Sequence, residues 1–196
     1  KEAKDALKKA ISLNPNYADA WFNASLAYLL DGDLIRGFDL YEWRPNKDKI
    51  ITRPSKDQCL WDGKQSLTGK TFLVYAEQGY GDIIQFSRYL PLLEAKGAKV
   101  TFKVTKRLHN LISTLGTQTK LLSEIPTDSD VDFEIPLMSL PYLFKTDLST
   151  LPAASPYLFA NSDRTRRWKK SLNTNSFKVG ICWQGSTGKN SYGRSF

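Results

Sequence analysis

The residues with the clearest chemical potential follow a short apolar run at 71–76. Segment 74–90 reads VYAEQGYGDIIQFSRYL, so Gly79 and Gly81 stand directly before an acid, Asp82, and a helix-like pattern begins there. Glycines between a strand and a helix let a ligand reach the backbone. The free N–H groups at the start of a helix suit oxygen-rich ligands. The segment therefore predicts a ligand-binding turn.

Asp82 has two compatible roles at the start of such a helix. The simpler role is to cap the helix, which is worth about 1 kcal/mol. The chemical role is that of a general base, because a helix N-terminus stabilises a carboxylate and keeps it ionised. An ionised carboxylate accepts a proton from a sugar hydroxyl that is held within reach. Glu77 lies near Asp82 in sequence and either orients a substrate or belongs to a surface loop.

Two common nucleotide-binding motifs are disfavoured. The dinucleotide fingerprint G-x-G-x-x-G/A requires a third small residue, and this chain has Ile84 at that position. No G-x-x-x-x-G-K-S/T phosphate loop follows the first strand either. NAD binding and P-loop chemistry are therefore poor explanations of the turn.

The rest of the chain predicts the elements that must position this turn. Strands are expected at 71–76, 100–104, near 120–122, 132–135, 156–159 and 177–183, and helices at 82–96, 106–115, 137–143 and 164–172. Alternating strands and helices predict a parallel sheet with right-handed crossovers. Ligands bind beyond the carboxyl ends of such strands. The two loops of interest are therefore EQGYGD after the first strand and QGSTGKNSYGRS after the last.

The first 45 residues predict three helices, interrupted at Pro15 and at Gly32. They resemble a tetratricopeptide repeat (TPR), whose pattern is W-x2-L-G-x2-Y, then A-x3-F, then P. The matching residues are Trp21, Ala24, Ser25, Tyr28, Gly37 and Tyr41, with Pro15 closing the preceding repeat. The small residues Ala24, Ser25 and Gly37 are expected to let paired helices approach closely.

The match covers about one and a half repeats, whereas a solenoid needs about three or more. We therefore expect further repeats upstream. Either this is a structural last repeat against the next domain, or it is a protein-binding surface.

Composition bounds the partners. The chain has 196 residues, 41% of them hydrophobic, and a net charge of +8, which favours an acidic partner such as a phosphorylated sugar, nucleic acid or anionic lipid. The densest basic stretch is DRTRRWKK at 163–170. A solvated helix face explains it, and a nucleic-acid interface built around Trp168 is the alternative, although no nucleic-acid-binding motif surrounds it. No nucleic-acid partner is expected.

Two cysteines, Cys59 and Cys182, and one histidine, His109, do not provide a convincing zinc site. So few cysteines in a chain of this length favour a reduced, cytosolic context over a disulfide framework. No run of about 18 apolar residues predicts a membrane span.

Several segments together are similar to bacterial TPR-containing glycosyltransferases. These are LVYAEQGYGDIIQFSRYLPLL, DFEIPLMSLPYLF and VGICWQGSTGKNSYGRS. The catalytic part of that family resembles the ADP-heptose:lipopolysaccharide heptosyltransferases and, more distantly, the TPR-bearing O-GlcNAc transferases. The resemblance implies a GT-B fold, in which two Rossmann-like domains face each other across a cleft. The first domain holds the acceptor and the second holds the nucleotide-sugar donor.

The resemblance also implies roles for residues of this chain. Asp82 matches the expected catalytic base, and Gln78, Gly79, Tyr80 and Gly81 match the turn that contacts substrate. Lys189 and Arg194 match residues beside the donor phosphates; without the resemblance, Lys189 is interpreted as a solvated loop lysine. The implied reaction is hexosyl or heptosyl transfer from a nucleotide sugar to a glycan, lipid-linked or protein acceptor.

No metal or cofactor is expected beyond the nucleotide-sugar substrate, because basic groups and a helix N-terminus can neutralise the leaving diphosphate. The implied location is cytoplasmic, with the inner membrane surface as the alternative.

The predicted fold class is α + α/β. TPR helices are expected at 1–45, a linker at 46–69, a Rossmann-like acceptor-side domain at 70–175, and the first strand and loop of a donor-side domain at 176–196. Since the chain starts within a helix pattern and ends within a loop, we expect a fragment that lacks transferase activity alone. The alternative function is a non-catalytic TPR scaffold with a degenerate sugar-binding domain, and a TPR-mediated protein partner fits both readings.

Overall fold

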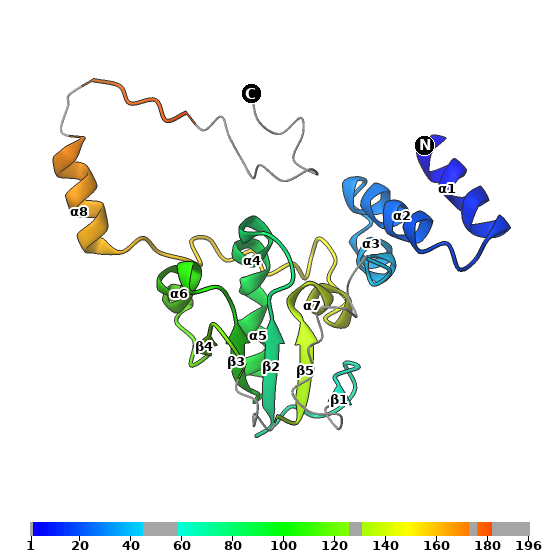
Figure 1. The fold of residues 1–196 in the computed structure, drawn as a ribbon, viewed down its shortest axis with the longest axis horizontal. Coiled ribbons are helices and arrows are strands. Elements are labelled where there is room, and N and C mark those ends of the chain that lie inside the picture. Colours follow the sequence, from blue (N-terminus) through cyan, green and yellow to red (C-terminus); the bar gives the residue numbers. More distant parts are fainter. Residues whose placement is uncertain (1, 45–58, 126–130, 173–175, 182–196) are drawn as a thin grey trace. The chain divides into compact units, whose positions relative to one another are not determined.

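The computed structural model describes residues 2–44, 59–125, 131–172 and 176–181 (Figure 1). The chain divides into two compact units, Lys1–Ala160 and Asn161–Phe196. Each unit is described by itself.

The first unit begins with three helices, as the sequence predicts. They are α1 (Glu2–Leu13), α2 (Ala18–Leu30) and α3 (Leu34–Tyr41). Gly32 adopts φ +82° between α2 and α3, a left-handed conformation that glycine adopts without strain. Asp33 caps α3, because its side chain accepts a hydrogen bond from the Arg36 N–H at 3.2 Å.

Small residues allow α2 and α3 to pack closely. Ala24, Ser25 and Gly37 are all buried. A Cβ atom added to Gly37 would lie 2.6 Å from Leu29 Cδ2 and 3.0 Å from the Leu29 backbone nitrogen. The expectation that small residues let these paired helices approach closely is therefore confirmed at Gly37.

The first unit then forms a five-stranded, wholly parallel sheet in the order β1-β5-β2-β3-β4. The strands are β1 (Cys59–Leu60), β2 (Thr71–Tyr75), β3 (Lys99–Lys103), β4 (Lys120–Leu122) and β5 (Phe133–Pro136). The predicted parallel sheet is confirmed. Within the segment predicted as a linker, 46–69, residues 59–60 form the edge strand β1, which pairs with β5, and Trp61 and Leu67 are buried.

The helices on the sheet are shorter than predicted. Instead of one helix over 82–96, α4 (Tyr80–Phe86) and α5 (Leu90–Ala95) flank a 3-10 turn at Ser87–Tyr89. Pro91 explains the break: it has no N–H to donate to the carbonyl of Ser87, and its ring crowds that carbonyl. Such a local break leaves Leu90 and Leu93 of α5 fully buried in the core.

The remaining helices lie after β3 and β5 in the first unit and in the second unit. They are α6 (Lys106–Ile112) with a 3-10 turn at Ser113–Leu115, a 3-10 turn at Leu137–Ser139 that leads into α7 (Leu140–Leu143), and α8 (Ser162–Ser171) in the second unit. In the described part of the chain, no helix combines the length and apolar character needed to cross a bilayer.

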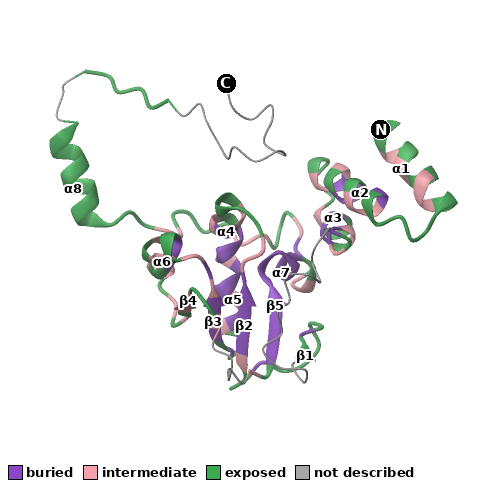
Figure 2. Ribbon diagram, viewed as in Figure 1, coloured by how far each residue is buried: buried purple, intermediate pink, exposed green. Residues whose placement is uncertain are grey.

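One core joins the N-terminal helices to the sheet. Phe38 and Tyr41 of α3 belong to the same buried cluster as Phe72 and Val74 of β2. The Phe38 ring meets the Phe86 ring of α4 edge-on, with centroids 6.1 Å apart. Figure 2 shows the buried surface concentrated on the central strands and the helices that cover them. Helix α3 is therefore built into the core of the α/β part.

Two predicted strands are not found. Residues 156–159 form no strand; instead the Tyr157 hydroxyl donates to the Ile84 carbonyl at 2.9 Å and Arg88 stacks over the Tyr157 ring. Side-chain contacts therefore hold this segment where strand pairing was expected. The described part of the predicted strand 177–183, residues 177–181, also forms no strand, and its apolar side chains are exposed. A strand requires a pairing partner, and sequence pattern does not supply one.

Gly37→Ala should destabilise the chain. The new methyl group would displace Leu29 and the α2 backbone, a kind of overpacking that typically costs about 1–3 kcal/mol. Urea unfolding measures the loss. Gly81→Ala in α4 is the matched control, because a Cβ there meets nothing within 4 Å. An unchanged unfolding midpoint for Gly37→Ala would contradict close helix pairing.

Asp132→Asn should remove part of the acid sensitivity of folding. Asp132 accepts from Lys70 Nζ at 2.7 Å and from the Thr71 N–H and hydroxyl at 2.8 Å each, which hold the pKa of its carboxyl well below the ordinary 3.8. With a lowered folded-state pKa, the stabilisation is complete above the unfolded-state pKa and is lost as the pH falls below about 4.

Urea midpoints at neutral pH and between pH 4 and 2 measure this effect. The native chain should lose stability more steeply with acid than the variant does. Asp163→Asn, at an exposed position, should retain the native slope. Parallel acid slopes for the native chain and Asp132→Asn would contradict the assignment.

Candidate functional site

The predicted turn lies where β2 ends and α4 begins, at the carboxyl edge of the sheet (Figure 1). Gly79 is the N-cap residue of α4, with extended backbone angles of φ −67° and ψ 169°. Tyr80, Gly81 and Asp82 form the first turn of the helix. The structure therefore brings four of the predicted site residues together in one helix start.

Asp82 caps the helix. Its Oδ2 atom accepts a hydrogen bond from the Gly79 N–H at 3.1 Å, and the side chain is half-buried. A carboxylate at the third position of a helix satisfies a backbone donor and interacts favourably with the helix dipole. The capping role is confirmed, and the role as a general base stays a prediction. Both are compatible, because a capped carboxylate remains an acceptor with further lone pairs.

Neither glycine of the turn is required by the backbone or the packing of the described chain. Both have negative φ. A Cβ atom on Gly81 would meet nothing within 4 Å, and one on Gly79 would meet only Asp82 Oδ2 at 3.4 Å. Glycine inside a helix costs about 1 kcal/mol relative to alanine. The open space in front of Gly81 is therefore the kind of backbone surface that a ligand can approach.

Gln78 is engaged by the N-terminal helices. Its Nε2 donates to the Tyr41 hydroxyl at 2.8 Å, and that hydroxyl also lies 3.2 Å from Gln78 Oε1. Burial raises the pKa of the Tyr41 hydroxyl, and the Gln78 hydrogen bond acts against that rise. The amide of Gln78 links the turn to α3, and its contact with substrate stays a prediction.

Glu77 is buried, so the surface-loop interpretation is wrong. Its side chain is 2% exposed, and Oε1 lies 2.7 Å from Arg44 Nη2 while Oε2 accepts from Arg44 Nε at 3.3 Å. The Met138 N–H donates to Oε1 at 3.2 Å. Burial raises the pKa of this carboxyl, and the Arg44 guanidinium opposes the rise.

Arg44 is the residue that sequence reasoning missed. It is buried, and besides Glu77 it donates to Glu42 Oε1 at 2.8 Å, to Ser139 Oγ at 2.9 Å and to the Tyr41 carbonyl at 3.2 Å. The available signal was an arginine directly after Trp43, among bulky apolar residues. That signal is weak, because its partner Glu77 lies 33 positions away in sequence.

Arg44 and its partners connect three segments around the turn: the end of α3, the end of β2 and the 3-10 turn after β5. Ser139 takes part twice, because its hydroxyl accepts from Arg44 and donates to Glu42 Oε2 at 3.0 Å. Every charged group in this cluster therefore has a charged or polar partner. Through Glu77, the cluster fixes the chain two residues before Gly79.

The remaining predicted site residues are Tyr80, Lys189 and Arg194. Tyr80 is 47% exposed at the start of α4. Lys189 and Arg194 lie outside the described residues, so their assignment to donor phosphates stays a prediction.

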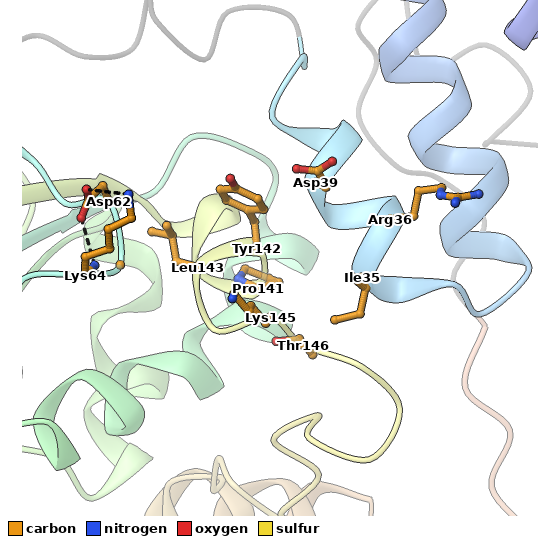
Figure 3. Close-up of a pocket in the computed structure, with 11 residues that line it drawn as sticks. Ile35, Arg36, Asp39, Asp62, Lys64, Pro141, Tyr142, Leu143, Lys145 and Thr146 are labelled. Atoms are coloured by element: carbon orange, nitrogen blue, oxygen red, sulfur yellow. Dashed lines mark hydrogen bonds and ion pairs between the residues drawn. The ribbon is translucent and has the colours of Figure 1, made fainter.

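A cavity of about 610 Å³ lies elsewhere in the first unit, between α3, α7 and the turn at Asp62–Lys64 (Figure 3). Its lining combines apolar side chains, such as Ile35 and Tyr142, with charges of both signs. Three of these charges already interact within the protein: Arg36 with the Tyr28 ring and hydroxyl, and Lys64 and Asp62 with each other. None of the predicted site residues that the structure describes lines this cavity.

Within the described ranges, no three His, Cys, Asp or Glu side chains gather in a way that could hold a metal ion. The turn itself offers a carboxylate, backbone N–H groups and an open glycine surface.

Comparison with known proteins identifies the N-terminal helices. A family model described as tetratricopeptide repeat matches residues 6–37, which span most of α1, all of α2 and the start of α3. The chain contains a tetratricopeptide repeat. No curated protein and no solved structure matches the chain.

Arg44→Met should strongly destabilise the chain, because it leaves the Glu77 carboxylate buried without its cation. Breaking a buried ion pair in this way costs about 3–5 kcal/mol. The double variant Arg44→Met/Glu77→Gln should lose less stability than the sum of the two single variants. A double-mutant cycle by urea unfolding measures the coupling. Simple additivity would show that the two side chains contribute independently and would contradict the buried pair.

Proposed function

We propose that the α/β unit is the acceptor-side half of a glycosyltransferase and that Asp82 is its general base. The observation that carries this proposal is the position of the Asp82 carboxylate. It stands at the carboxyl edge of a parallel sheet, where such folds bind ligands, and directly beside an open glycine surface at Gly81. The resemblance of the EQGYGD segment to heptosyltransferase-like enzymes selects sugar transfer among the reactions that such a site supports.

In the proposed reaction an acceptor hydroxyl attacks the anomeric carbon of a nucleotide sugar. Asp82 takes the hydroxyl proton as the new C–O bond forms, and the bond to the nucleotide diphosphate breaks. The leaving diphosphate carries the electron pair and is neutralised by basic groups, for which Lys189 and Arg194 are the candidates. The donor sugar is of hexosyl or heptosyl type, and the acceptor is a glycan, a lipid-linked sugar or a protein.

The surroundings of Asp82 favour an acceptor sugar over a large apolar ligand. Tyr80 offers an exposed aromatic ring on one side of the turn, and Gly81 leaves room for a ring to approach the backbone. Just before this surface in sequence, Glu77 pairs with Arg44 and Gln78 donates a hydrogen bond to Tyr41. They therefore act as positioning residues in the proposed site, whereas Tyr80, Gly81 and Asp82 face the substrate.

A TPR-mediated scaffold is the second candidate function, and the repeat match at residues 6–37 favours it. Tetratricopeptide helices bind other proteins in repeat architectures with concave surfaces. Large apolar side chains such as Leu13, Tyr17 and Leu30 are exposed on or beside these helices, at 77%, 48% and 89% respectively. They provide a surface for a further repeat or for a protein partner.

Asp82→Asn should abolish most transferase activity while preserving the fold. The test uses the full reading frame that contains this chain, a panel of nucleotide sugars with glycan acceptors, and release of nucleotide diphosphate as the readout. Loss of a positioned general base lowers the rate by about 10²–10⁴-fold. Asp33→Asn is the matched control, because Asp33 also caps a helix but lies outside the turn.

Donor-dependent release that collapses in Asp82→Asn and persists in Asp33→Asn would support the proposal. Equal release from Asp82→Asn and the native protein would remove Asp82 from the mechanism. If calorimetry detected no binding of any nucleotide sugar, the scaffold function would be favoured.

A further variant, Gly81→Ala, should keep or raise stability yet weaken acceptor use, because its methyl group fills the open surface.

A further inference from the structure

Helix α8 in the second unit carries a dense cationic surface that the proposed transferase chemistry does not use. All of its residues are exposed (Figure 2). The helix reads SDRTRRWKKS and contains five basic residues and one acid. Trp168, in the middle of this run, is 64% exposed. A large exposed aromatic ring among cations is a typical feature of an interaction surface.

The side chains of α8 are sorted by face. Helical geometry places Arg164, Trp168 and Leu172 four residues apart on one side, and Leu172 is 49% exposed. Arg164, Arg167, Trp168 and Ser171 line a hollow of about 370 Å³ on the helix surface. Two guanidinium groups therefore flank the indole ring.

The one acid of the helix, Asp163, forms its ion pair with Arg166, which does not line this hollow. Asp163 lies 3.5 Å from Arg166, whose position is about 200° around the helix from Arg164. The indole face thus presents Arg164 and Arg167 toward solvent as donors for an anion. Guanidinium groups bind phosphate through paired N–H groups, which suits a phosphate-bearing partner.

Apolar side chains decide between a lipid surface and a nucleic acid. Beyond the helix in sequence, Phe177, Val179 and Ile181 are exposed at 93%, 72% and 74%. Together with Trp168 and Leu172 they gain free energy by entering the apolar boundary of a bilayer, and a polynucleotide backbone offers them no comparable environment. We propose that α8 is a membrane-surface contact that binds anionic phospholipid headgroups through Arg164 and Arg167, with Trp168 inserted at the interface.

Vesicle co-sedimentation tests this contact with the whole chain. The probes are phosphatidylcholine vesicles with and without phosphatidylglycerol, at about 0.15 M salt and again at about 0.5 M, where screening is stronger. The native chain should bind the anionic vesicles and release them at high salt. Arg164→Gln/Arg167→Gln should weaken binding by about fivefold per lost cation, or roughly 25-fold in total. Trp168→Ala should weaken binding without any change in charge.

A matched control separates a defined surface from net charge. Lys106→Gln/Arg107→Gln on α6 also removes two positive charges, from exposed positions in the other unit. It should retain most of the binding. Equal losses in the two double variants, or equal binding to neutral vesicles, would overturn the proposal. Tighter binding of a single-stranded oligonucleotide than of anionic vesicles at the same salt would also overturn it and assign the surface to nucleic acid.

Discussion

The structure of the first unit depends on the burial of one guanidinium group. Arg44 lies inside the protein, where an unpaired charge would be costly, so it must be surrounded by acceptors. Glu77, Glu42, Ser139 and the Tyr41 carbonyl meet this requirement, and they come from the end of α3, the end of β2 and the turn after β5. Satisfying one charge therefore fixes three segments relative to one another.

This constraint explains why the glycine turn is well positioned although its own residues make few contacts. Gly81 has open space around it. The described hydrogen bond of the Asp82 side chain is to the Gly79 N–H, three residues earlier. The rigidity comes from the residues just before the turn, because Glu77 binds Arg44 and Gln78 binds Tyr41. A site that keeps its reactive face open while hydrogen bonds and an ion pair hold the residues just before it matches what precise substrate positioning requires.

The N-terminal helices and the α/β part belong to one compact unit, because residues of α3 pack into the core of the sheet. Tyr41 and Phe38 enter the core of the sheet, and Trp43 stacks on Trp21 with ring centroids 5.6 Å apart. Helix α3 therefore belongs both to the region of the tetratricopeptide repeat and to the core of the α/β part. Helix α3 connects the repeat to the proposed site, because Tyr41 accepts a hydrogen bond from Gln78 in the turn.

The sequence alone determined the local features: the three N-terminal helices, the parallel order of strands and helices, the close contact at Gly37 and the cap at Asp82. Each depends on residues near one another in sequence, where periodicity and turn chemistry act. The break of the long helix into α4 and α5 follows locally from Pro91, whereas only the tertiary structure decided the edge strand β1 and the burial of the Glu77 side chain. Arg44 and Glu77 show the reason, because a charge so distant in sequence is matched only once the chain has folded.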